Sequence, residues 1–125
     1  MMPCQIMLVE DNVPIRTLFA RTLIKAGHTV IAFREGTEAL RHLVDNMPDV
    51  AVVDLNLPGA SGFDIMKYIR AQDHLRGTKI ILASANNVHA SSAEGRLADV
   101  ILRKPVLPYE LVVAVQRMEK ERAFL

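Results

Sequence analysis

A continuous apolar run at residues 50–53 leads directly into Asp54, and the chain then turns at Pro58 and Gly59. A short apolar run bounded by turn residues is typical of a strand that is buried on both faces, as in a parallel sheet. Open α/β folds keep their ligand sites at the carboxyl edge of such a sheet. Asp54 is therefore the first candidate for a reactive residue.

Strand and helix patterns alternate along the rest of the chain. Apolar strand patterns cover residues 5–9, 28–33, 49–54, 79–83 and 100–102, and helical patterns lie between most of them and after the last. This alternation predicts an α/β fold: a doubly wound, five-stranded parallel sheet with helices on both faces and right-handed crossovers. Two strand orders are common for such sheets, and the pattern alone does not choose between them.

The segment between the fourth and fifth strands is the weakest part of the pattern. Its apolar stripe is diluted by small and polar residues: Asn86, Asn87, Ser91, Ser92 and Gly95. Such residues have low helix propensity and leave no continuous apolar face to bury. We expect a fourth helix that is short, irregular or mobile.

The overall composition limits the classes of function. A chain of 125 residues that is 50% apolar is expected to form one domain, residues 1–125, with a core of its own. The net charge of +1, without a basic stripe, argues against direct nucleic-acid binding. The apolar runs are too short to span a membrane, and the N-terminus lacks the features of a signal peptide. We expect a cytoplasmic protein that binds neither membrane nor nucleic acid.

The cysteine and the histidines give little indication of function by themselves. Cys4 is the single cysteine, which fits a reducing compartment, and we interpret it as a small apolar residue at the start of the first strand. The four histidines are not clustered at metal-ligand spacing in the sequence: His28, His42, His74 and His89. We expect them to be solvated or to lie at the edge of the core.

Polar side chains follow four of the five predicted strands. Glu10 and Asp11 follow the first strand, Asp54 ends the third, Ser84 follows the fourth, and Lys104 follows the fifth. The carboxyl ends of parallel strands meet at one edge, so these side chains should converge. Three carboxylates repel one another, and a divalent cation would relieve that repulsion. Oxygen ligands without Cys or His indicate Mg²⁺, and a lysine with a hydroxyl indicates a phosphate.

In this combination of motifs the chain resembles the response-regulator receiver domains of two-component and phosphorelay signalling. The matching segments are VEDN, VVDLNLPGASG, LASA and RKP, which contain the polar residues just named. The resemblance extends over essentially the whole chain. It implies the flavodoxin-like strand order 2-1-3-4-5.

The resemblance also implies a role for each residue near the acceptor. Asp54 would be the nucleophile that takes a phosphoryl group from the phosphohistidine of a sensor histidine kinase or a histidine phosphotransfer protein. Mg²⁺ would be held by Asp11, Asp54 and the backbone carbonyl of Asn56, with Glu10 acting mainly through water. Lys104 would supply a second positive charge.

Other residues would act after transfer. Ser84 would hydrogen-bond a phosphoryl oxygen, and this new contact would switch a protein–protein surface. Asn56 and Asn86 occupy the positions that line the path of the hydrolytic water. The protein would thus catalyse its own phosphorylation and dephosphorylation, as a switch and not as a turnover enzyme. Its output partner would be a downstream protein or effector domain, and phosphorylation could be linked to dimerisation.

The chain departs from the family pattern in the segment that leads to Lys104. Ile101 stands where the family usually has Tyr or Phe, Val106 stands where it usually has Phe, and the stretch from Ser84 to Lys104 is about two residues short. Pro105 is expected to follow a cis peptide bond, as in the family. These departures leave the chemistry intact but question the usual output mechanism.

Two alternatives remain at this point. One is a constitutive interaction module that keeps the receiver fold without being regulated by phosphorylation, which is motivated by Ile101. The other is an unrelated flavodoxin-like protein that binds a cofactor. The second is disfavoured, because the sequence has no Gly-rich phosphate loop and no aromatic platform for a flavin.

Overall fold

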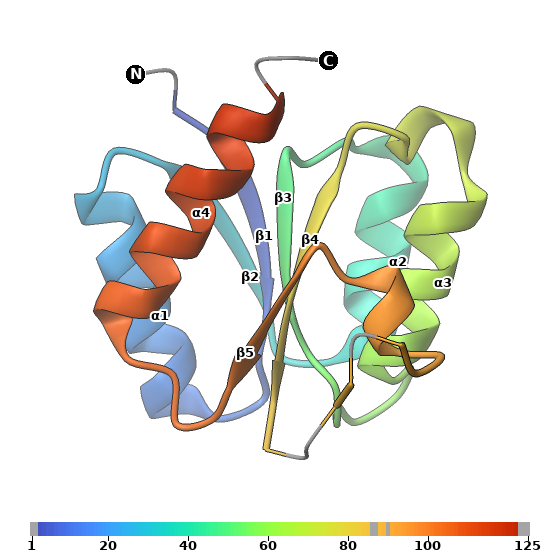
Figure 1. Ribbon diagram of the computed structural model, residues 1–125, viewed down its shortest axis with the longest axis horizontal. Coiled ribbons are helices and arrows are strands. Elements are labelled where there is room, and N and C mark those ends of the chain that lie inside the picture. Colours follow the sequence, from blue (N-terminus) through green and yellow to red (C-terminus); the bar gives the residue numbers. More distant parts are fainter. Residues whose placement is uncertain (1–2, 86–87, 90, 123–125) are drawn as a thin grey trace.

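Five parallel strands form the centre of the structure, a computed structural model that describes residues 3–85, 88–89 and 91–122 (Figure 1). The strands are β1 (Gln5–Val9), β2 (Thr29–Phe33), β3 (Val50–Asp54), β4 (Lys79–Ser84) and β5 (Val100–Arg103). Every neighbouring pair is parallel, and the order is β2-β1-β3-β4-β5. This order decides between the two that the pattern left open and confirms the flavodoxin-like arrangement.

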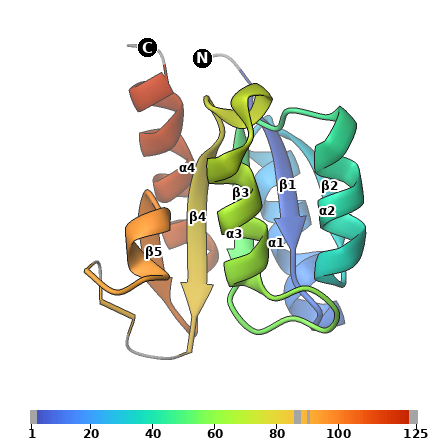
Figure 2. The same ribbon diagram turned by 90° about the vertical axis from the view of Figure 1, so that its right-hand side faces the viewer.

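Four α-helices cover the two faces of the sheet (Figures 1 and 2). The helices α1 (Val13–Lys25) and α4 (Pro108–Arg122) pack on one face, and α2 (Gly36–Asp45) and α3 (Gly62–Ala71) pack on the other. Alternate residues of the strands pack into the two layers of the core. Ile6, Leu8 and Val52 lie in the layer under α1 and α4, and Met7, Val9 and Val53 lie in the layer under α2 and α3. All of β3 is buried, as its unbroken apolar run predicts.

The helix ends follow from local chemistry. Asn12 precedes α1, and its side chain accepts a hydrogen bond from the backbone N–H of Ile15. Gly27, just after α1, has φ of 101°, a conformation that favours glycine. Ser61 and Asp64 form a capping box at the start of α3, in which each side chain accepts from the other residue's backbone N–H.

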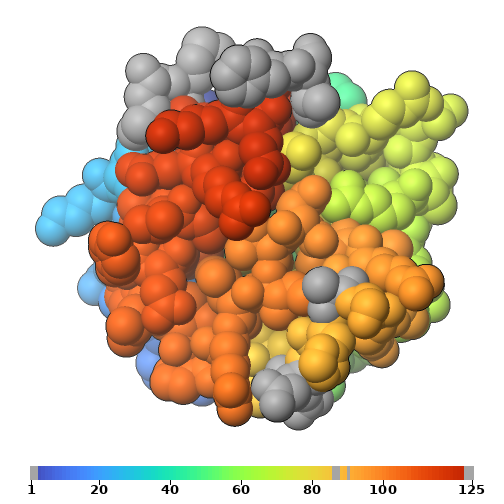
Figure 3. Space-filling model, in the orientation of Figure 1, coloured from blue at the N-terminus to red at the C-terminus, as the bar shows by residue number. Residues whose placement is uncertain are grey.

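The connection between β4 and β5 differs from the other crossovers. Its described residues contain no α-helix and only the 3₁₀ turn η2 (Gly95–Leu97), whereas the chain between α3 and β4 adds a second such turn, η1 (Asp73–Leu75). Figure 2 shows η2 as a small coil beside the sheet, and in Figure 3 the described part of this segment forms part of the surface next to α4. The expectation of a short, irregular fourth helix is confirmed, while Asn86 lies outside the described residues.

His28 corrects an expectation from the sequence. The residue is 5% exposed, so it is neither solvated nor at the edge of the core. Its backbone N–H donates to the carbonyl of Leu23, and its Nδ1 accepts a hydrogen bond of 3.0 Å from the backbone N–H of Cys4. The ring is buried because it joins the turn after α1 to the residue that precedes β1. Cys4 itself is buried, as predicted.

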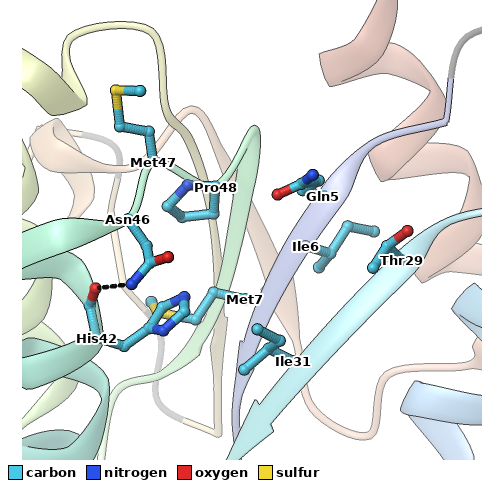
Figure 4. A pocket seen from close by; sticks show the side chains of 9 residues that line it. All are labelled: Gln5, Ile6, Met7, Thr29, Ile31, His42, Asn46, Met47 and Pro48. Atoms are coloured by element: carbon cyan, nitrogen blue, oxygen red, sulfur yellow. Dashed lines mark hydrogen bonds between the residues drawn. The ribbon is translucent and has the colours of Figure 1, made fainter.

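Within the described ranges, no helix is long and apolar enough to cross a membrane. A small pocket of about 50 Å³ lies at the starts of β1 and β2, beside the chain that precedes β3 (Figure 4). His42 and Asn46 are among its lining residues, and the Asn46 side chain donates to the carbonyl of His42. The volume suits one or two water molecules, and no carboxylate lines the pocket.

Candidate functional site

Three carboxylates converge at the carboxyl edge of the sheet. Glu10 and Asp11 follow β1, and Asp54 ends β3, the neighbouring strand. One carboxylate oxygen from each of the three lies within 4.8 Å of the others. Glu10 and Asp54 are 3% and 6% exposed, whereas Asp11 is exposed. The structure thus brings together the three acidic residues that the sequence placed at this edge.

Lys104, which directly follows the edge strand β5, completes this cluster. Its Nζ lies 2.8 Å from Oδ2 of Asp54 and 3.3 Å from Oε1 of Glu10. The backbone N–H of Lys104 donates to the carbonyl of Ser84, which continues the pairing of β4 with β5 past the end of the strand. The peptide bond from Lys104 to Pro105 is cis, as expected.

The cluster shifts the pKa values of two of its members. Burial raises the pKa of Glu10 above its ordinary value, and the charge of Asp54 adds to the rise, although Asn12 and Lys104 oppose it. Burial alone would lower the pKa of Lys104, but hydrogen bonds and charges from Asp54 and Glu10 outweigh burial and raise it. The lysine is therefore a permanent cation at neutral pH.

Charge remains unbalanced at this edge of the sheet. Three carboxylates surround one ammonium group, so the cluster carries an excess of two negative charges when all are ionised. The donors are all oxygens, and one of the carboxylates is open to solvent. Such a set fits a hard divalent cation of the size of Mg²⁺, which keeps several waters and takes few carboxylates.

Arg16, on the first turns of α1, holds the backbone of the acidic loop. Its Nη1 donates to the carbonyl of Glu10 at 2.9 Å and to that of Asp11 at 3.5 Å. The N–H of Asn12 donates to Oε2 of Glu10 at 3.2 Å. The sequence analysis missed Arg16, and the only signal was its position four residues after the helix cap, within reach of the loop.

The loop after Asp54 depends on two glycines. Gly59 has φ of 73°. A Cβ at Gly62 would collide with the backbone carbonyl oxygen of Asp54, so the start of α3 can approach Asp54 only without a side chain. Asn56 lies in this loop and is exposed. The role of its carbonyl as a metal ligand stays a prediction.

The remaining predicted residues lie on β4, on β5 and in the segment that joins them. Ser84 ends β4, next to the strand of Asp54, and is 1% exposed. Ile101 pairs with Leu82 across β4 and β5 and is half-buried. Asn86, the second predicted water-positioning residue, is outside the described part of the chain.

An apolar hollow of about 390 Å³ opens beside Lys104. It lies between α1 and the chain that follows β5, and its other lining residues are Ile15, Leu18, Phe19, Pro105 and Val106. Leu18 is 49% exposed. An apolar surface next to a charged cluster is suited to contact with a partner protein.

Comparisons with known proteins agree with this geometry. Residues 6–116 match the family model of the response regulator receiver domain. The polar-differentiation response regulator DivK of Brucella anthropi is 34% identical over 84 residues, which are 67% of this chain and 68% of DivK. The transcriptional regulatory protein GltR of Pseudomonas aeruginosa is 30% identical over 121 residues, which are 95% of this chain but 50% of GltR. The chain thus spans about half the length of GltR.

The fold comparison gives the same result. The chemotaxis response regulator CheY4 of Vibrio cholerae superposes with a TM-score of 0.85 at 29% identity, covering 94% of this chain and 99% of CheY4. Three observations indicate the same family: the sheet order, the acidic cluster with its lysine, and the match to the family model. The chain belongs to the family of response regulator receiver domains, which act in two-component signalling.

Proposed function

We propose that Asp54 is the phosphoacceptor of a two-component switch, and that its donor is a phosphohistidine on a sensor histidine kinase or a histidine phosphotransfer protein. The observation that carries this proposal is the position of the Asp54 carboxylate, buried between two other carboxylates and 2.8 Å from Lys104 Nζ. A carboxylate that is held in place by a contacting cation can act as a nucleophile.

The reaction moves one phosphoryl group between two side chains. A carboxylate oxygen of Asp54 forms the new O–P bond while the P–N bond of the phosphohistidine breaks. The departing imidazole nitrogen keeps the bonding electron pair and takes up a proton. Little covalent work falls to other residues, because phosphoryl transfer depends mainly on alignment and on neutralising charge.

Glu10, Asp11 and Asp54 form the set that would hold Mg²⁺, with the backbone carbonyl of Asn56 as a further ligand. Bound there, the ion supplies positive charge against the oxygens of the transferred group. The three carboxylate residues themselves fix the direction from which the phosphoryl group approaches Asp54. Glu10 is buried and bonded to Lys104 and to the N–H of Asn12, so it serves to position its neighbours.

Lys104 contributes its charge to the phosphorylated state. Its Nζ already contacts Oδ2 of Asp54, so a phosphoryl group on that carboxylate comes within its reach. Ser84, on the adjacent strand, contributes a hydroxyl donor. Asn56 and Asn86 act in hydrolysis by positioning water, which limits the lifetime of the aspartyl phosphate.

The apolar hollow beside Lys104 is our candidate for the surface that receives the donor protein. The same two elements also carry exposed apolar side chains, at the start of α1 and around the start of α4: Val13 is 58% exposed, Leu107 57% and Tyr109 74%. A partner that docks there brings its phosphohistidine near Asp54. The output is a changed contact with a downstream protein or effector domain, or with a second copy of this chain. The protein acts in the cytoplasm.

The test is incubation of the pure protein with acetyl phosphate and Mg²⁺, followed by intact-mass measurement. We expect one added phosphoryl group in the wild type, none in Asp54→Asn, and none when Mg²⁺ is chelated. Asp73→Asn is the matched control, because Asp73 is a fully solvated carboxylate that is distant from Asp54 in the sequence. It should be phosphorylated like the wild type.

Absence of an adduct would contradict the proposal, provided that rapid hydrolysis is excluded. Beryllofluoride, a stable mimic of the aspartyl phosphate, provides this check. A protein that neither gains the phosphoryl group nor binds the mimic would instead be a constitutive interaction module. Partner binding that is unaffected by Asp54→Ala would support the same conclusion.

A further inference from the structure

A second cluster of ligand-type side chains lies at the opposite, amino edge of the sheet. Cys4 comes just before β1, His28 just before β2, and Glu119 lies near the end of α4. The Cys4 sulfur, a His28 ring nitrogen and a Glu119 carboxylate oxygen all lie within 4.8 Å of one another. Figure 1 shows the start of β1 beside the last turns of α4, far from the carboxyl ends of the strands.

The bonding of His28 leaves part of its ring without a partner. Nδ1 accepts the N–H of Cys4, so the neutral ring carries its proton on Nε2. Nε2 is buried and has no hydrogen-bond partner in the part of the chain that the structure describes. A buried polar atom without a partner is costly, and the structural hydrogen bond from Cys4 accounts for only one of the two ring nitrogens.

Glu119 is also distinguished from its neighbours. Within the described ranges, Glu121 on the same helix pairs with Lys79 and Arg117, whereas Glu119 forms no ion pair. Glu119 is half-buried and close enough to Cys4 to raise the pKa of the thiol, after burial itself, to about 11. The Glu119 carboxylate therefore lies close to a thiol and an imidazole, and Arg122, the cation whose charge also acts on this thiol, is paired with Asp49.

We propose that Cys4, His28 and Glu119 bind a borderline-soft divalent cation of the Zn²⁺ type. Sulfur, imidazole nitrogen and carboxylate oxygen are the three donor types that Zn²⁺ takes in proteins. A thiolate, a neutral imidazole and a carboxylate together balance the two charges of the ion. The bound set is then neutral, which suits a site in which two of the three residues are more than nine-tenths buried.

The geometry requires only a small adjustment. Tetrahedral Zn²⁺ with ordinary bond lengths holds its ligand atoms roughly 3.4–3.6 Å apart, and the present atoms are within 4.8 Å. Ligation through Nε2, the ring nitrogen without a partner, requires the ring proton to move to Nδ1, so it exchanges the hydrogen bond from the Cys4 N–H for a metal bond. Water completes the fourth position on the solvent side, where Glu119 is half-exposed.

The two edges of the sheet would then select different ions. The carboxyl edge offers oxygens alone, which suit Mg²⁺, whereas the amino edge offers sulfur and nitrogen, which Mg²⁺ binds poorly. Because the amino-edge ligands come from the starts of β1 and β2 and from α4, ligation would join the two ends of the chain. An ion bound only to the folded protein stabilises it by mass action.

The experiment is a titration of the full chain with Co²⁺, a spectroscopic substitute for Zn²⁺, with excess Mg²⁺ to occupy the acidic site. Cys4 is the only cysteine, so a thiolate-to-cobalt charge-transfer band reports this site alone. We expect that band with the strong visible absorption of tetrahedral cobalt, saturating at one equivalent and abolished by Zn²⁺. Cys4→Ser should abolish the charge-transfer band.

Glu119→Gln and Glu121→Gln form a matched pair on one helix. Both side chains are at least partly exposed, so both variants should fold. We expect Glu119→Gln to weaken Co²⁺ binding at least about tenfold, and Glu121→Gln to leave it within about twofold. Phosphorylation by acetyl phosphate should be unchanged in both, which separates this proposal from that for Asp54.

Three results would overturn the proposal. The first is the absence of a charge-transfer band in the folded protein. The second is a cobalt spectrum of octahedral type that persists in Cys4→Ser, which would indicate binding at the acidic cluster alone. The third is equal weakening by the two glutamine substitutions, which would indicate adventitious binding on α4.

Discussion

The crossover from β3 to β4 and the connection from β4 to β5 solve the same topological problem in different ways. The first contains α3, a ten-residue helix that starts with a capping box and buries Ile65, Met66 and Ile69. The described residues of the second contain only η2, a three-residue turn in which Gly95 alone is buried. Both connections nevertheless bring the next strand into parallel register with the one before it.

This difference between the two connections indicates that the chemistry of the site and the output of the signal depend on different parts of the fold. The site residues Asp54, Ser84 and Lys104 stand at or just after strand ends, and the sheet fixes these ends through the pairing of β3, β4 and β5. The lack of an α-helix in the described residues between β4 and β5 therefore leaves Asp54 and Lys104 in place. It does alter the surface beside β5, where a phosphorylation-dependent contact would form. The following predictions test this separation.

The largest expected effect is from Gly62→Ala, at the start of the well-formed crossover. The added Cβ would collide with the Asp54 carbonyl oxygen and lie under 3 Å from the Cα of Leu55. We expect a loss of about 3 kcal/mol in the free energy of unfolding, measured with urea. Gly77→Ala is the control, because a Cβ there meets nothing within 4 Å. It should be neutral or slightly stabilising. Equal effects would contradict the close approach.

Lys104→Met should destabilise the Mg²⁺-free protein by about 2–3 kcal/mol at neutral pH, because two buried carboxylates lose their cation. The pKa of Lys104 is raised above 10.5, so its contribution is complete below pH 10.5 and is lost as the pH rises through the folded-state value. The difference from the wild type should also shrink in acid, where Glu10, with its raised pKa, is protonated early.

Urea unfolding from acid to alkaline pH, in the presence of a chelator, measures this difference. Lys67→Met is the matched control, since the pair of Lys67 with Asp64 is half-exposed on both sides. We expect it to cost less than about 0.5 kcal/mol. A Lys104→Met protein as stable as the wild type at neutral pH would mean that the ammonium does not offset the buried carboxylates.

Two serines give a smaller and directly matched test. Ser61 Oγ accepts the N–H of Asp64, and Ser92 Oγ accepts the N–H of Gly95, each three residues along the chain. Ser61→Ala should cost about 1 kcal/mol, because it removes the cap of a packed helix. Ser92→Ala should cost less than about 0.5 kcal/mol, because only the three-residue turn η2 follows and not a packed α-helix. A larger loss for Ser92→Ala, by urea unfolding, would show that η2 supports the fold.

The smallest effect on chemistry is expected from Ile101→Tyr, which restores the residue type usual in the family. Ile101 is half-buried on β5 and forms none of the hydrogen bonds or ion pairs described for the acidic cluster. The rate of phosphorylation by acetyl phosphate, followed by intact mass, should stay within about twofold of the wild type. A change of about tenfold or more would mean that this position is coupled to the acceptor after all.

Most of the fold and of the acidic cluster could be predicted from the sequence for one reason. Buried parallel strands have continuous apolar runs, and the residue after each run must lie at the same edge. Residues 50–53 therefore located Asp54, and the same reasoning located Glu10 and Lys104. The strand order needed the resemblance to the family, because periodicity carries no information about which strands are neighbours.

The features that the sequence analysis missed depend on contacts that form only in the folded chain. His28 stands in a polar-looking turn, and nothing near it in the sequence indicates that its ring meets Cys4, which is 24 residues away. Glu119 is farther still along the chain. Arg16 looks like an ordinary solvated residue of an amphipathic helix, and only the folded loop shows that its guanidinium reaches two carbonyls.

Arg16 has a consequence for the thermodynamics of ion capture. Fixing a flexible backbone residue costs roughly 1–2 kcal/mol of conformational entropy. Because Arg16 already holds the carbonyls of Glu10 and Asp11, the folded protein has met this cost before any cation arrives. The loop is preorganised, so a cation that bound there would not have to order it. The affinity of the acidic cluster for a cation would thus depend partly on Arg16, which holds the backbone of the loop.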